Sequence, residues 1–117
     1  MSLYTVRREI ETVGTANAAS TGVAKSTAAD DVREQLTAAG ADAIDTLDVE
    51  AADIYEFPSG PFDPYRIHID VTLAVTVEAS DDVAAGEIGR QRIGEILTAS
   101  GLDDVEYAGP EQVDTAA

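Results

Sequence analysis

The only histidine of the chain lies between an arginine and an aspartate in an alternating segment. Arg66, His68 and Asp70 are spaced two residues apart, so on a β-strand they share one sheet face at steps of about 7 Å. An imidazole beside a carboxylate can act as an oriented general base or form part of a metal site. One histidine and one aspartate are too few ligands for a closed zinc site, so we expect no metal and no other cofactor. The alternative is a polar face whose charges pair with each other or meet a second subunit.

Aromatic side chains gather directly before this segment. Residues 55–65 hold four of the six aromatics and three of the four prolines. Aromatics concentrated on one loop can anchor a partner or line a pocket, and the candidate binding residues are Tyr55, Phe57, Phe62 and Tyr65. The other interpretation is a lid that closes the open end of a core poor in large side chains.

The elements that must position these residues follow from periodicity. Apolar residues alternate without a break over 65–77, which predicts a long strand in the centre of a sheet. Other patterns predict strands over residues 4–13, 44–54 and 105–107, and helices over 27–40 and 80–101. Residues 14–26 are small and polar, and could be loop or helix.

Local signals mark the predicted helix ends. Ser80 is the expected N-cap of the second helix, and Gly40 and Gly101 are expected to end the two helices. Three glycines inside the second helix, Gly86, Gly89 and Gly94, do not have the spacing of a phosphate-binding loop. We expect the first two to allow close approach to the sheet.

The order strand–helix–strand–strand–helix–strand is the split βαβ arrangement. It predicts an α+β fold: a two-layer ferredoxin-like sandwich (βαββαβ) with an antiparallel sheet and two helices on one face. Residues 1–110 are expected to form this single domain, and residues 111–117 a flexible C-terminal tail.

The net charge limits the possible partners and surroundings. The 23 acidic and 7 basic residues give −16, and the acids are dispersed along the chain. Dispersed acids with a single lysine fit a protein that works in molar salt, where the Debye length falls to about 3 Å and self-repulsion is screened. The alternative is an acidic mesophilic protein that binds a basic partner. Nucleic acid is an unfavourable partner, because phosphate contacts need clustered cations. With no signal-like start and no long apolar stretch, we expect a cytoplasmic protein without a membrane partner.

Part of the chain resembles an uncharacterised family of short archaeal (haloarchaeal) proteins of unknown function. The resemblance rests on Pro61-Phe62-Asp63, the alternating strand after it, the pairs Ile88-Gly89 and Ile93-Gly94, and Tyr4-x-Val6. Members of that family carry a Cys-x-x-Cys pair just before Pro-Phe-Asp. These positions hold Tyr55 and Pro58 here, so the resemblance implies an archaeal source and carries over no metal or redox role.

Two functions are consistent with these observations. The first is a non-catalytic interaction or small-ligand-binding module that uses residues 55–65 and the open sheet face. The alternative is a small enzyme or enzyme subunit with His68 as acid/base beside Asp70 and Arg66. We also expect a homo-oligomer, most simply a dimer, because Thr72, Ala74 and Thr76 would otherwise leave an uncharged outer face on a central strand.

Overall fold

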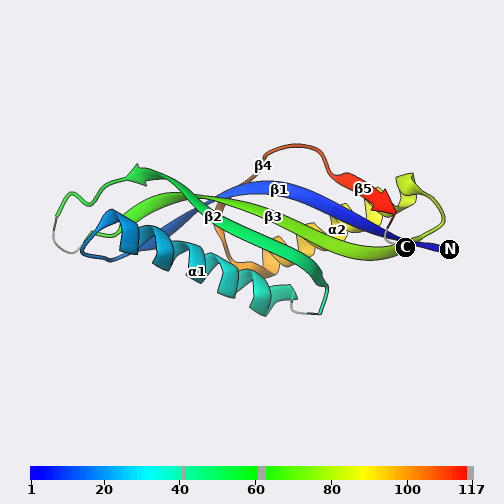
Figure 1. Cartoon of the computed structure of the whole chain (residues 1–117), viewed down its shortest axis with the longest axis horizontal. Coiled ribbons are helices and arrows are strands. Elements are labelled where there is room, and N and C mark those ends of the chain that lie inside the picture. The colour runs from blue at the N-terminus through cyan, green and yellow to red at the C-terminus, as the bar shows by residue number, and fades with distance from the viewer. Residues whose placement is uncertain (41, 61–62, 116–117) are drawn as a thin grey trace.

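The computed structural model of the chain describes residues 1–40, 42–60 and 63–115. Within these ranges, five strands and two helices follow one another (Figure 1). Their bounds are β1 Ser2–Ala16, α1 Thr21–Gly40, β2 Ile44–Glu56, β3 Tyr65–Ala79, α2 Asp82–Ser100, β4 Asp103–Tyr107 and β5 Gln112–Thr115. Neither helix is long and apolar enough to cross a membrane, as far as the described residues go.

The strands form one antiparallel sheet in the order β2-β3-β1-β4, so the chain has an α+β fold. β3 is an interior strand, as its unbroken alternation predicts. The free side of β1 is shared by two short strands. β4 pairs with the part of β1 around Ile10–Val13, and β5 pairs with Tyr4–Arg7. The connection between β4 and β5 therefore runs along the middle of β1.

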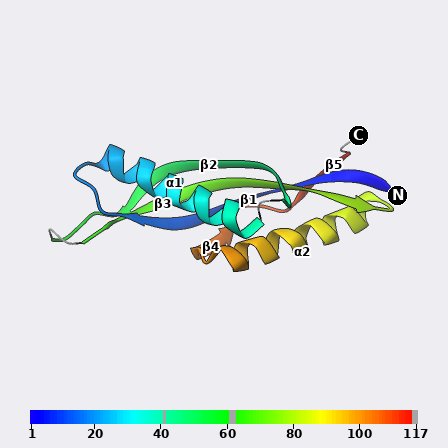
Figure 2. The same ribbon diagram turned by 90° about the horizontal axis from the view of Figure 1, so that it is seen from below.

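Both helices pack on the same face of the sheet, which we call the inner face. A Cβ atom on Gly14 would lie 3.1 Å from Ala28 of α1, and one on Gly89 of α2 would lie 2.4 Å from Val6. Gly14 and Val6 are an even number of residues apart on β1, so both face the same side of the sheet. Their neighbours α1 and α2 therefore lie on that side. α1 covers one half of the long sheet and α2 the other half (Figure 2). They meet where Gly40 contacts Ile96.

The inner row of β3 explains the core. Ile67, Ile69, Val71, Leu73, Val75 and Val77 are all at most 1% exposed. The residues between them point to the outer face, on which neither helix lies. That face of β3 is polar and partly exposed apart from Ala74, which is buried. The outer face is thus the surface on which the predicted site residues must be sought.

Several predicted bounds were wrong. α1 begins at Thr21 and not at residue 27, and β1 extends to Ala16, so residues 14–26 are divided among strand, turn and helix. The N-cap of α2 is Asp81 and not Ser80, because the Asp81 carboxylate accepts the Ala84 N–H at 2.8 Å. The C-terminal ends of both helices were right, and Gly101 adopts the left-handed conformation with φ 71°.

The sequence prediction also missed a strand. Within residues 111–117, expected to be a flexible tail, Gln112–Thr115 form β5 on the edge of β1. Val113 packs against the core beside Gly86. The pattern of β5 is too short and polar to signal a strand by itself, because an edge strand needs little apolar surface.

Candidate functional site

The candidate site begins with a contact between the two predicted groups of residues. His68 lies on the outer face of β3, since Ile67 and Ile69 on either side of it point into the core. Tyr55 is near the end of β2, after a register shift between Ala51 and Ile54. Such shifts turn a side chain away from its regular direction. The two rings meet edge to face, with centroids 4.8 Å apart and planes at 69°.

These rings form one wall of a hollow of about 470 Å³ on the outer face. The hollow extends across β3 and β1 as far as β4. It is lined by Glu11, Thr12, Val13, Tyr55, His68, Asp104, Val105 and Glu106. His68 is paired directly with Val13 in the ladder of β3 and β1, so an aliphatic side chain lies beside the imidazole in this wall. Part of a small molecule could be buried here between an aromatic wall and a polar wall.

Arg66 ties the two sides of the outer face together. Its guanidinium lies 3.4 Å from Asp104 of β4 and 3.9 Å from Glu56 of β2. The same group lies 5.2 Å from the centroid of the Tyr55 ring, within reach of a cation–π attraction. Arg66 therefore spans the sheet beside the hollow and helps to fix the side chains of Tyr55 and Asp104.

The predicted Arg66, His68 and Asp70 share one face, but the structure does not join them into a catalytic group. Among the described residues, no hydrogen bond or ion pair links His68 to Asp70, and Arg66 pairs with other carboxylates. Asp70 is exposed, and its partners across the ladders are Glu11 and Glu50. Asp70 is also absent from the lining of the hollow, which contains His68 alone of the three.

The predicted aromatic segment is divided between two faces. Phe57 packs edge to face on Tyr65 with centroids 6.1 Å apart. Tyr65 is opposite Ala16 in the inner row, whereas Tyr55 is on the outer face with His68. Phe62 lies outside the described residues. Of the three predicted binding residues that the structure describes, Tyr55 alone lines the hollow.

Sequence reasoning did not find the acidic side of the hollow. Glu11 and Glu106 are direct neighbours in the ladder of β1 and β4, and Asp104 has a φ of 50° at the start of β4. Cross-strand proximity depends on register, and the register of this pair shifts between Glu11 and Val13. No group of three or more possible metal ligands occurs within the described ranges.

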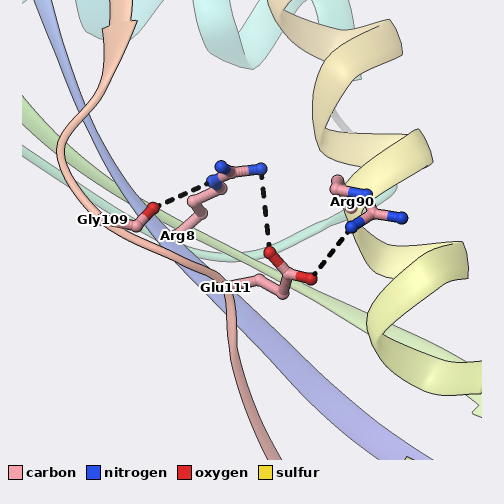
Figure 3. Close-up of polar contacts among 4 residues, drawn as sticks. All are labelled: Arg8, Arg90, Gly109 and Glu111. Carbon is pink, nitrogen blue, oxygen red and sulfur yellow. Dashed lines mark hydrogen bonds and ion pairs between the residues drawn. The ribbon is translucent and has the colours of Figure 1, made fainter. Parts of the chain in front are cut away.

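A second polar cluster lies on the inner side, in the gap between β4 and β5 (Figure 3). Arg8 of β1 donates to the Gly109 carbonyl at 3.2 Å, and its guanidinium carbon lies 3.6 Å from the centroid of the Tyr107 ring. Glu111 accepts a hydrogen bond from Arg90 of α2 at 3.4 Å and forms an ion pair with Arg8 at 3.8 Å. Arg8, which interrupts the apolar row of β1, is thus the partner of the connection between β4 and β5.

Comparison with known proteins gives little. No protein-family model and no curated protein matches the sequence. Among solved structures, a hydantoinase/carbamoylase-family amidase from Burkholderia multivorans is 14% identical, with a TM-score of 0.37, over 97% of this chain and 30% of its own. A putative amidohydrolase/peptidase from Burkholderia cenocepacia is 13% identical, with the same TM-score, over 100% of this chain and 31% of its own. The chain thus spans less than a third of these structures, and likenesses at these scores carry no argument about function.

Proposed function

We propose that the chain is a non-catalytic module that binds a small ligand in the hollow between Tyr55 and Glu106. The observation that supports this most directly is the hollow itself, which brings the single histidine and an aromatic of the 55–65 segment to one place. Ligand pockets typically combine an apolar lining with a few polar groups that fix orientation. Val13 and the Tyr55 ring supply the former, and His68 supplies one of the latter.

The charges of the hollow restrict its ligand. Glu11, Asp104 and Glu106 would repel an anion at close range. At protein interfaces, bringing like charges together costs on the order of several kcal/mol. Arg66 compensates only part of this charge, since Glu56 also pairs with it. We therefore expect a neutral or cationic molecule to bind in preference to a phosphate or a carboxylate.

Fragment binding followed by NMR tests this proposal. The full chain, labelled with ¹⁵N in molar KCl, is titrated with a fragment set of cationic, neutral and anionic compounds. We expect binders to shift the amides of Val13, His68 and Glu106. His68→Ala should weaken their binding about ten-fold, which corresponds to about 1.4 kcal/mol.

Asp70→Asn is the matched control, because it is on the same strand and face but outside the hollow. This variant should not change the affinity of any fragment. If no fragment shifts the three amides at mM concentration, or if both variants behave alike, the proposal is wrong.

The alternative function is a small enzyme in which His68 is the acid/base, with Asp70 and Arg66 beside it. The presence of His68 in the hollow is the observation in its favour. In that case a bound compound would be converted, and Asp70→Asn would lower kcat while leaving binding unchanged. The contacts of Arg66 and the exposure of Asp70 favour the binding module.

The remaining proposals concern the molecule as a whole. The element order and the strand order β2-β3-β1-β4 support a ferredoxin-like sandwich, with β5 as an addition. The dispersed acids support a cytoplasm at high salt, and the sequence resemblance an archaeal source. The uncharged outer positions Thr72 and Thr76, which are partly exposed, support a homodimer, whereas Ala74 between them is already buried within one copy. Static light scattering in molar KCl tests this last point, and a monomer mass at all concentrations would contradict it.

A further inference from the structure

β5 is only weakly integrated into the molecule. It has four residues, three of which are exposed, and none belongs to the fully buried core. Val113 alone packs against the core, from its rim. A strand that contributes one half-buried side chain can detach at low cost, because little apolar surface returns to water. The body of the fold has its own core without β5.

The place that β5 occupies is nevertheless specific. Glu111, directly before the strand, lies between Arg8 and Arg90 (Figure 3), with side chains of Arg8 and Glu111 only 14% and 21% exposed. The chain has just seven lysines and arginines, and two of them face this one carboxylate. Gly86 leaves space for Val113, since a Cβ on it would lie 3.4 Å from that side chain. The edge of β1 thus accepts an extended segment with a carboxylate and, two residues later, an aliphatic side chain.

The connection between β4 and β5 has the composition of a hinge. It contains Gly109 and Pro110. Proline fixes its own φ and biases the preceding residue toward extended backbone. Glycine accepts the change of direction that is needed when the strand leaves its own β1. An extended hinge of this kind would direct β5 away from the body.

We propose that the edge of β1 at Tyr4–Arg7, with Arg8 and Arg90, is a strand-docking site through which two copies of the chain exchange β5. The proposal rests on the self-association proposed above and names the segment that produces it. The occupant is the Gln112–Thr115 strand of a second copy, preceded by that copy's Glu111.

Charge and hydrogen bonding both favour this occupant. When β5 detaches, the backbone groups of Tyr4–Arg7 become an open strand edge, which readily pairs with another chain. The strand of a second copy carries the carboxylate that Arg8 and Arg90 pair with and the valine that fits beside Gly86. Exchange thus restores the ion pairs, the ladder and the packing of β5, and the free-energy cost is confined to the hinge and to association. Thr76, on the outer face proposed for the dimer, is paired with Thr5 of the same edge.

Cysteine trapping in the full chain tests the exchange, because the chain has no cysteine of its own. Thr5 and Asp114 are directly paired in the ladder of β1 and β5, a separation that suits a disulfide. The double variant Thr5→Cys/Asp114→Cys establishes that the pair can be oxidised. Thr5→Cys and Asp114→Cys single variants are then mixed in molar KCl with a mild oxidant. The control mixture replaces Thr5→Cys by Glu9→Cys, on the same face of β1 and about 13 Å further along.

Exchange predicts a covalent heterodimer from the first mixture, formed about a hundred-fold faster than in the control, because docking raises the local thiol concentration to the mM range. Equal yields in the two mixtures would overturn the proposal, as would a double variant that fails to close its disulfide. Light scattering separates this result from the broader proposal. A dimer without preferential trapping refutes the exchange alone, whereas a monomer refutes self-association as well.

Discussion

Gly89 provides the most direct test of the packing between helix and sheet. A Cβ added at this position would lie 2.4–2.5 Å from the Cβ and both Cγ atoms of Val6. Val6 is fully buried, and rotation about its χ1 cannot remove its Cβ from the contact. Gly89→Ala therefore forces α2 away from β1 or displaces the strand.

The magnitude of this effect follows from two opposing contributions. Overpacking a close-packed core costs about 1–3 kcal/mol, and replacing glycine by alanine in a helix returns about 1 kcal/mol. All side-chain carbons of Val6 are involved, so the upper part of the first range applies. We expect Gly89→Ala to lower the free energy of unfolding by about 1–2 kcal/mol and Tm by about 4–8 °C for a chain of this length.

Urea unfolding at constant molar KCl measures the difference without changing ionic strength. Gly94→Ala is the matched control, because it lies in the same helix and its new Cβ would meet only the Tyr107 hydroxyl, at 3.9 Å. It should gain up to about 1 kcal/mol from helix propensity alone. If Gly89→Ala is as stable as Gly94→Ala, the close contact between α2 and β1 does not exist as described.

Three further predictions concern charges and caps. Glu111→Gln removes both ion pairs at the start of β5, so amide exchange in Gln112–Thr115 should accelerate about two- to five-fold, with the free energy of global unfolding nearly unchanged. The difference in exchange rate between variant and wild type should narrow as KCl rises. Unaltered exchange would show that these pairs do not hold the strand. Asp81→Ala should lower the free energy of unfolding, measured with urea, by about 1 kcal/mol, whereas Ser80→Ala should leave it unchanged. If Ser80→Ala is the destabilising variant, Ser80 is the N-cap. The free energy of unfolding of the wild type should rise with KCl up to molar concentrations, because the net charge of −16 repels itself when unscreened; a flat salt profile would contradict the halophilic interpretation.

The parts of the fold that could be predicted are those with strong local signals. The alternation of β3 identified an interior strand, and Gly40 and Gly101 marked both helix ends. The first turn of α1 was missed because residues 21–26 are small and give almost no amphipathic pattern. β5 was missed because an edge strand with one half-buried side chain has no periodicity to detect. Asp81 and Ser80 are both good caps, and only backbone geometry distinguishes them.

The candidate site divides along similar lines. His68 and Tyr55 stood out by residue type, and their proximity then required only a hairpin between β2 and β3. Glu11, Asp104 and Glu106 could not be distinguished from the other acids of so acidic a chain, since their convergence depends on a sheet register with a shift in it. Arg8 was recognised as an interruption of the pattern, but its partner Glu111 is more than a hundred residues away.

The end-to-end placement of the two helices also determines how the molecule moves through solution. Its extents are 56 × 24 × 21 Å and its radius of gyration is 15.8 Å, against about 13.4 Å for a spherical domain of the same length. An elongated particle has a larger friction coefficient than a sphere of equal mass. A single copy will therefore elute from a sizing column earlier than its 12.2 kDa mass suggests, and will sediment more slowly. The apparent mass derived from elution volume alone would be too large, and a monomer would be taken for a dimer.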